Sequence, residues 1–292
     1  MKLGSHRILL AFFWLSGFLT LASVGILLIF LFVKGVPSLS LELIFGDADP
    51  LRALLLRERV FDGLFPAIVG TTAVVILSVS WAIPVGIAAG VYLAEFSSRR
   101  VKKIFDFSFD ILAAIPSILI GLFGLTVAIF LHQYFSNRIY PCLLISSVAL
   151  AVLVLPYIVR TTQLSIDAVP HPMRAAGLSL GASKLQNLYH VILPRSLTGI
   201  LSGVILALGR AAEDTAVIML TGVVATAGIP GSLLTKYEAL PFYIYYISSQ
   251  YTDQKELMSG FGAALILLTI CAFLFIAAHL FRNLLVRRLS QH

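Results

Sequence analysis

Six apolar runs divide this 292-residue chain, and each is long enough to cross a bilayer as a helix. A helix needs roughly 20 apolar residues to span the hydrocarbon core. Inside that core every backbone polar group must be paired within the protein, which favours helices. The runs cover residues 8–33, 66–93, 108–131, 142–159, 197–222 and 260–281. They predict an all-α membrane protein with six transmembrane helices, formed by residues 1–292 as a single domain.

The composition excludes several classes of protein. Only 12% of the residues are charged, against about 25% in a soluble domain, so the net charge of +7 does not indicate nucleic-acid binding. The two cysteines, Cys142 and Cys271, lie in apolar runs and predict neither a disulfide nor a metal site. No phosphate loop of the form G-x-x-x-x-G-K-[ST] occurs. We therefore expect no cofactor on this chain and no ATP bound by it.

The lysines and arginines predict the orientation, because cytoplasmic loops of membrane proteins carry an excess of both. Thirteen lie on the side of the two termini: Lys2, Arg7, Arg99, Arg100, Lys102, Lys103, Arg160, Arg174, Lys184, Arg195, Arg282, Arg287 and Arg288. Seven lie on the other side: Lys34, Arg52, Arg57, Arg59, Arg138, Lys236 and Lys255. We expect a multi-pass protein of the cytoplasmic (inner) membrane with both termini in the cytoplasm. The first run is longer than the core of a cleaved signal peptide, so we expect it to remain as a helix.

The loop over residues 170–194 falls on the predicted cytoplasmic side and has prolines at both ends. Small and apolar residues recur in it at helical spacing, which predicts a helix outside the membrane. Gly177 and Gly181 lie one turn apart. Glycine costs about 1 kcal/mol relative to alanine inside a helix, so a close approach of another backbone is expected here. The loop then docks either on a partner protein or on this chain's own helix ends.

This loop resembles the signature loop of ABC importer permeases, E-A-A-x-x-x-G followed after nine residues by I-x-L-P. Here the register is Ala175-Ala176-Gly177, then Gly181, then Val191-Ile192-Leu193-Pro194. The resemblance implies the type I importer permease fold, with a cytoplasmic coupling helix that sits in a cleft of an ATPase. Ala175 stands where the family has glutamate, and Gly177 stands where it has its second alanine, so that glutamate's role does not transfer. The implied coupling residues are Arg174, Ala175, Ala176, Gly177, Gly181, Ala182, Leu193 and Pro194.

Further stretches are similar to the phosphate permeases of this family, and to their A-type subunit more than to its C-type partner. They include Gly70-Thr71-Thr72, Ala114-Ile115-Pro116-Ser117 and Val159-Arg160-Thr161-Thr162. The resemblance implies uptake of inorganic phosphate, received from an external binding protein. It also implies a second permease, either C-type-like or a copy of this chain, and two cytoplasmic ATPase subunits that bind ATP-Mg. This chain would then be a permease subunit and not an enzyme.

Arg210, Glu213 and Asp214 form a charged cluster in the fifth run. Each charge at that depth costs at least about 2.5–3.5 kcal/mol on insertion scales. Arg210 can reach Glu213 at i+3 or Asp214 at i+4 on one helix face. One interpretation is an anion transport path, because a guanidinium suits phosphate or sulfate oxygens. The other is a buried network that fixes helix packing.

The same cluster leaves the identity of the transported anion undecided. The phosphate permeases read R-A-x-G-E-T, whereas this chain reads Arg210-Ala211-Ala212-Glu213-Asp214-Thr215. The additional acid makes the cluster net negative unless Glu213 points elsewhere or is protonated, which burial favours. Molybdate, tungstate, sulfate or a phosphonate therefore remains an alternative cargo.

Two other functional classes are disfavoured by the sequence. A self-sufficient secondary transporter would be expected to show internal repeats, and none is visible in the sequence. An intramembrane enzyme would need a His/Glu metal constellation or a Ser/His pair. The histidines lie outside the apolar runs or at their edges.

Overall fold

The computed structural model describes residues 2–54, 60, 63–136 and 139–289. Within this part the chain forms helices and no strand, and six segments are long and apolar enough to cross a membrane. The prediction of an all-α membrane protein with six spans is confirmed. Arg57, Arg59 and Arg138, which entered the orientation argument, lie outside the described residues, as do the side chains of Lys2, Arg7, Arg287 and Arg288.

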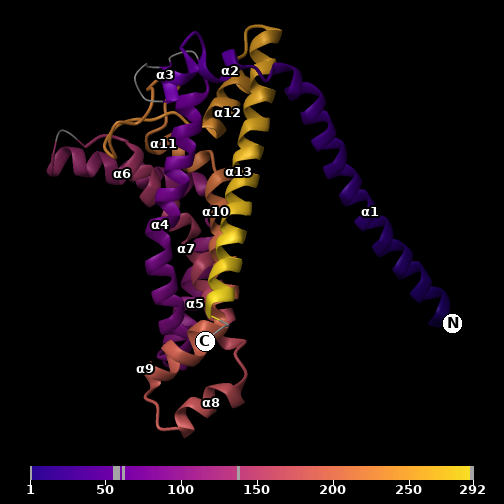
Figure 1. Ribbon diagram of the computed structural model, residues 1–292, viewed down its shortest axis with the longest axis vertical. Helices are drawn as coiled ribbons and strands as arrows, with labels where there is room; N and C mark the ends of the chain where they lie inside the picture. Colours follow the sequence, from indigo (N-terminus) through magenta and orange to yellow (C-terminus); the bar gives the residue numbers. More distant parts are fainter. Residues whose placement is uncertain (1, 55–59, 61–62, 137–138, 290–292) are drawn as a thin grey trace.

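The helices follow one another along the chain. They are α1 (Lys2–Gly35), η1 (Val36–Ser38), α2 (Leu41–Phe45), α3 (Pro50–Leu54), α4 (Phe65–Glu95), α5 (Arg99–Ala114), α6 (Ser117–Tyr134), α7 (Leu143–Asp167), α8 (His171–Ser179), α9 (Lys184–Asn187), the π-helical turn η2 (Leu188–Ile192), α10 (Leu193–Glu213), α11 (Ala216–Thr221), α12 (Leu240–Gln250) and α13 (Gln254–Leu289). The connection over residues 222–239 separates α11 from α12. α2, α3 and α12 lie at one end of the bundle, which we call the α12 end (Figure 1). α8 and α9 lie at the opposite end, which we call the α8 end.

The centre of the bundle is formed by α4, α7 and α10. Lipid is as apolar as leucine, so helices in a membrane associate through close packing of small residues. A Cβ at Gly86 would lie 2.7 Å from a methyl carbon of Ile158, and one at Gly90 would lie 2.6 Å from Cβ of Thr162. The side chain of Ile158 is fully buried. The glycines thus let α4 pack closely against α7.

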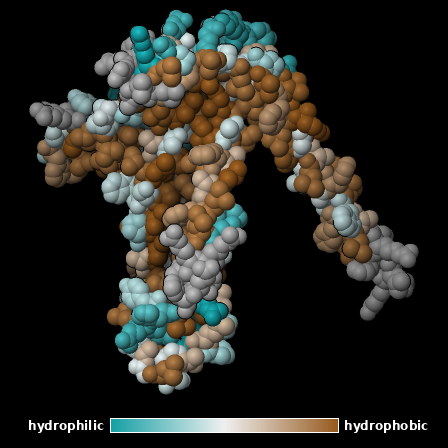
Figure 2. All heavy atoms as spheres, in the orientation of Figure 1, coloured by the Kyte–Doolittle hydropathy of each residue, from teal (hydrophilic) through white to brown (hydrophobic). Residues whose placement is uncertain are grey.

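α1 diverges from the bundle and meets it only near its C-terminal end (Figure 1). There Gly35 packs against Leu265 of α13, and the rings of Phe30 and Phe261 lie 5.6 Å apart. The apolar side chains of residues 9–33 are otherwise largely exposed. In Figure 2, hydrophobic residues cover the middle of the bundle and much of α1, and hydrophilic residues gather at the two ends of the bundle.

The third predicted span, 108–131, is wrong as a single helix. The chain leaves helical geometry at Ile115 and Pro116, and α5 and α6 are separate helices. A residue before proline is pushed out of the helical region by a clash with the proline ring, and Ile115 has an extended ψ of 129°. α6 crosses the direction of α4, whereas α5 lies beside α7 (Figure 1). The candidate span begins at Ser117.

The fifth predicted span, 197–222, is also interrupted. α10 begins earlier, at Leu193, and ends at Glu213, and Asp214 is extended before α11 begins. The Asp214 carboxylate accepts a hydrogen bond of 2.9 Å from the Val217 N–H, which satisfies one of the free donors at the start of the next helix. The fourth span is longer than the predicted 142–159, because α7 continues to Asp167.

The loop over 170–194 is helical in pieces. α8 ends at a turn in which Gly181 has φ +83°, a left-handed conformation that glycine adopts without steric cost. Ser183 and Gln186 then form a capping box that starts α9. A Cβ at Gly181 would meet nothing within 4 Å, so this glycine serves the turn. Gly177 does have a close neighbour, but it is the side chain of Asn187 in the same loop. The expected approach of another backbone is therefore wrong for both glycines.

Candidate functional site: two charged clusters and the loop of α8 and α9

Arg210 lies in the last turn of α10 and pairs with both acids of the predicted cluster. Its guanidinium is 2.7 Å from the Glu213 carboxylate and 3.8 Å from that of Asp214. The Glu213 side chain is 65% exposed, whereas that of Asp214 is only 3% exposed. The structure therefore brings the three predicted residues together and gives the two acids different surroundings.

Asp214 has a structural task besides its pairing with Arg210. One carboxylate oxygen caps α11 through the Val217 N–H, and another faces the guanidinium. Arg210 in turn stands at the C-terminal end of α10, where the helix dipole favours a positive charge. The buried Asp214 carboxylate thus has contacts that stabilise the fold, whereas the Glu213 carboxylate is exposed.

The arrangement places one guanidinium, a group that suits oxyanions, beside two carboxylates. With Glu213 in place, one positive charge faces two negative charges, and the cluster is net negative. When the exposed Glu213 side chain turns away, Arg210 regains donors that suit an oxyanion. The geometry thus supports an exchange between Glu213 and a bound oxyanion at Arg210.

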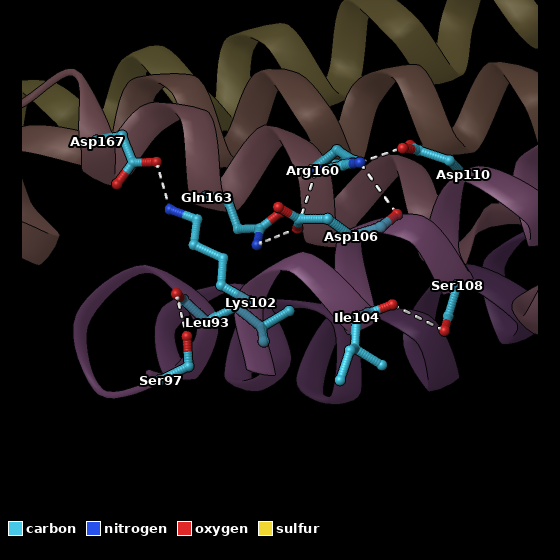
Figure 3. Close-up of polar contacts among 10 residues, drawn as sticks. All are labelled: Leu93, Ser97, Lys102, Ile104, Asp106, Ser108, Asp110, Arg160, Gln163 and Asp167. Atoms are coloured by element: carbon cyan, nitrogen blue, oxygen red, sulfur yellow. Dashed lines mark hydrogen bonds and ion pairs between the residues drawn. The ribbon is translucent and has the colours of Figure 1, made fainter. Parts of the chain in front are cut away.

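A second charged cluster joins α5 to α7 (Figure 3). Arg160 of α7 lies 2.9 Å from the Asp106 carboxylate and 2.5 Å from that of Asp110. Gln163 donates to Asp106 at 3.0 Å, and Lys102 pairs with Asp167 at 2.9 Å. The charged side chains are partly exposed, and ion pairs at such positions stabilise by only about 0–1 kcal/mol each, whereas Gln163 is buried. Together they fix α5 along the surface of α7.

Sequence reasoning missed this second cluster. The predicted runs leave Arg160 just after the fourth span, among the cytoplasmic basic residues, and put Asp110 inside the third span. One signal was available. Lys102, Asp106 and Asp110 recur every four residues, which places them on one face of a helix. That stripe indicates that 99–114 is an amphipathic helix rather than the beginning of a span.

Arg174 is half-buried in the loop of α8 and α9, and its side chain is 18% exposed. Its guanidinium lies 2.5 Å from the Glu95 carboxylate and donates to the carbonyl oxygens of Ile166 and Val169. Asn187 donates to the Arg174 carbonyl at 3.0 Å. Arg174 is a predicted coupling residue, but its side chain points toward the bundle and not toward the surface of the loop.

The other predicted coupling residues are distributed over the surface of the loop. Ala175 and Ala176 are exposed on α8, Gly181 is exposed in the turn, and Ala182 is half-buried beside it. Leu193 and Pro194 are half-buried at the start of α10. Large apolar side chains are exposed nearby: Met173, Leu178, Leu180, Leu185 and Tyr189. Leu180 has the highest exposure, at 89%.

The described residues contain no group of three or more His, Cys, Asp or Glu side chains that could hold a metal ion. Cys142 is buried and Cys271 is half-buried, and both are free thiols.

Residues 82–291 match the model of the family described as binding-protein-dependent transport system inner membrane component. The chain belongs to this family. The predicted resemblance to ABC importer permeases is therefore confirmed, and the family consists of membrane components rather than enzymes.

Named relatives and solved structures extend this result. The chain is 30% identical over 272 residues to the phosphate transport system permease protein PstA of Haemophilus influenzae, covering 92% of each chain. It is 31% identical over 273 residues to the PstA protein of Pasteurella multocida, covering 91% of this chain and 90% of the relative. A chain of the MetNI methionine ABC transporter, in an inward facing conformation, has a TM-score of 0.56 at 17% identity, covering 83% of this chain and 99% of that chain. This last likeness supports the fold alone.

Proposed function

We propose that this chain is a membrane-spanning subunit of an ATP-driven importer that takes up inorganic phosphate across the cytoplasmic membrane. The observation that carries the proposal is its similarity to the two PstA proteins over more than nine tenths of the chain. The loop of α8 and α9 and the Arg210 cluster supply the two parts that such a subunit needs, a docking element and a polar path.

The orientation follows from the basic residues at the α8 end. Arg99, Arg100 and Lys103 are exposed at the start of α5, and Lys184 is exposed at the start of α9. Positive charge of this kind collects on the cytoplasmic side. The α8 end then faces the cytoplasm together with both termini, and the α12 end faces outward.

The proposed partners correspond to three surfaces of the chain. The importer has two ATPase subunits, which bind ATP-Mg. One of them docks where Leu178, Leu180 and Leu185 are exposed, because apolar side chains of this size favour a protein interface. A second permease, either PstC-like or a copy of this chain, covers the apolar side chains of α1. An external binding protein delivers phosphate at the α12 end.

In this mechanism, ATP-driven closure of the ATPases moves α8, and the bundle alternates between outward-open and inward-open states. Arg210 receives the anion when Glu213 turns away. Two hydrogen-bond donors in a fixed fork then contact two phosphate oxygens. Hydrolysis takes place on the ATPases, and this chain supplies the path.

A second cargo is favoured by one observation. Glu213 stands where the phosphate permeases have glycine, and its carboxylate occupies the guanidinium at 2.7 Å. An anion must displace the Glu213 carboxylate to reach Arg210. The charge of the anion and the geometry of its oxygens then determine which anions bind. Molybdate, tungstate, sulfate and phosphonates share the oxygen geometry.

Uptake of labelled phosphate by proteoliposomes that hold the complete importer tests this proposal. Phosphate uptake that depends on ATP and on the binding protein is expected, with sulfate and molybdate in excess as weak competitors. Arg210→Ala should reduce uptake strongly, whereas the matched control Lys103→Ala removes an exposed positive charge elsewhere and should not. Normal uptake by Arg210→Ala would make the cluster structural. Displacement of phosphate by another oxyanion would assign the second cargo.

A further inference from the structure

The loop of α8 and α9 contains no carboxylate between residues 171 and 194, although it contains Arg174 near its beginning. The side chain of Arg174 is 18% exposed and that of its partner Glu95 is 19% exposed. Glu95 is the last residue of α4. The charge of Arg174 is thus neutralised by the chain's own bundle and is turned away from the surface that a partner would contact, whereas the other basic residue of the loop, Lys184, is exposed.

The position of Arg174 suits a cation because two helices end beside it. α4 ends at Glu95 and α7 ends at Asp167. The last carbonyl groups of a helix lack partners within the helix and carry partial negative charge. Arg174 donates to the carbonyls of Ile166 and Val169 and to the Glu95 carboxylate. One side chain of α8 therefore binds the ends of both α4 and α7.

The main chain of α8 is held from its other side. Asn187 is buried and donates to the Arg174 carbonyl at 3.0 Å. Gly177 lets the Asn187 side chain approach, since a Cβ at residue 177 would overlap the amide. α8 therefore contacts α9 as well as the ends of α4 and α7.

We propose that Arg174 is a positioning residue that transmits the movement of α8 to α4 and α7 through its contact with Glu95. This inference rests on the proposed function, because it assumes that a partner moves α8. A push on the exposed face of α8 reaches α4 through the ion pair and α7 through the two carbonyls. α4 and α7 are packed along their length by Gly86 and Gly90, so both helices move together.

The test uses the importer assembled with its ATPases, second permease and binding protein. The variants are Arg174→Ala, Glu95→Gln and the exchanged pair Arg174→Glu with Glu95→Arg, with Arg100→Ala as an exposed control. Three quantities are measured: the amount of ATPase that copurifies, ATP hydrolysis, and anion uptake per ATP hydrolysed. Melting of each variant in detergent shows whether it has folded.

Both single variants should keep the ATPase and hydrolyse ATP, with uptake per ATP lower by about tenfold, as for the loss of coupling between two sites. The exchanged pair should regain part of the coupling, because it restores opposite charges at the same positions. Arg100→Ala should match the wild type.

Two results would overturn the inference. In one, uptake per ATP is unchanged in both single variants. In the other, Arg174→Ala loses the ATPase while Glu95→Gln keeps it, since Arg174 would then bind the partner directly. Failure of the proposed function is seen separately, as a wild-type complex that carries no phosphate. The coupling ratio is then measured with the anion that the complex does carry.

Discussion

Asp214 offers the sharpest test of whether the Arg210 cluster serves the fold or the path. Two substitutions separate its tasks. Asp214→Ala removes both the cap on Val217 and the charge beside Arg210. Asp214→Asn keeps an oxygen that can accept from the Val217 N–H and removes only the charge.

The expected magnitude follows from burial. The side chain of Asp214 is 3% exposed, so in Asp214→Ala no water replaces the lost acceptor. A capping residue contributes about 0.5–2 kcal/mol, and a buried donor left without a partner costs about 1–3 kcal/mol. These describe the same loss, so the free energy of unfolding should fall by about 2 kcal/mol. Asp214→Asn should stay within about 1 kcal/mol of the wild type, since the ion pair at 3.8 Å contributes only about 0–1 kcal/mol.

The assay is thermal unfolding in detergent, followed with a thiol-reactive dye that reports the exposure of buried Cys142. A loss of about 2 kcal/mol lowers the melting temperature by about 4–8 °C for a chain of this size class. Asp214→Asn should also lower the KM for phosphate uptake, because the cluster is then no longer net negative. Equal melting of the Ala and Asn variants would refute the capping argument, and a raised KM in Asp214→Asn would refute the charge argument.

Three further predictions concern backbone geometry and pH. Gly90→Ala adds a Cβ 2.6 Å from Thr162, and overpacking of about 1–3 kcal/mol should lower the melting temperature relative to Gly25→Ala, whose Cβ meets nothing within 4 Å. Gly181→Ala forces a left-handed φ of +83° at about 1–2 kcal/mol and should reduce uptake while membrane insertion stays normal. Burial raises the pKa of the Glu238 carboxyl, although the Ala227 and Gly228 amides that donate to it act the other way. A raised pKa stabilises the fold most below the unfolded-state pKa of about 4.3, and this stabilisation is lost as the pH rises through the folded-state pKa. Glu238→Gln should therefore melt at a temperature that depends less on pH between 4 and 7.

Each of these predictions has its own contrary result. Gly90→Ala and Gly25→Ala would have to shift melting equally for the close packing of α4 on α7 to be unimportant. For Gly181, the matched change Gly231→Ala is made in open space at another exposed loop position, and equal uptake by the two variants would remove the role of the turn. For Glu238, a wild-type and Gln variant with the same pH dependence would show that its ionisation is not linked to folding.

Hydropathy was sufficient to predict the number of spans, because each apolar run is longer than a helix needs to cross the core. It could not locate the breaks inside two of them. Pro116 alone does not locate the first break, because whether a proline bends or ends a helix depends on what the next segment packs against. The interruption at Asp214 arises from a side chain that caps α11, and that contact is visible only once α11 exists.

The candidate site also has parts that the sequence could predict and parts that it could not. The pairing of Arg210 with an acid follows from helical spacing and was predictable. The role of Arg174 was not, because its partner Glu95 lies 79 residues earlier in the chain, and no local spacing relates the two. The resemblance to the family loop placed Arg174 among the docking residues, whereas its side chain faces inward.

α1 has 34 residues, which corresponds to about 50 Å of helix, and only its end at Gly35 is joined to the bundle. An arm of this length reaches across the full thickness of a membrane and beyond the radius of the bundle itself. The subunit therefore has a footprint wider than its helical bundle. A surface that covers the exposed apolar side chains of α1 must therefore follow the length of a helix rather than form one flat face.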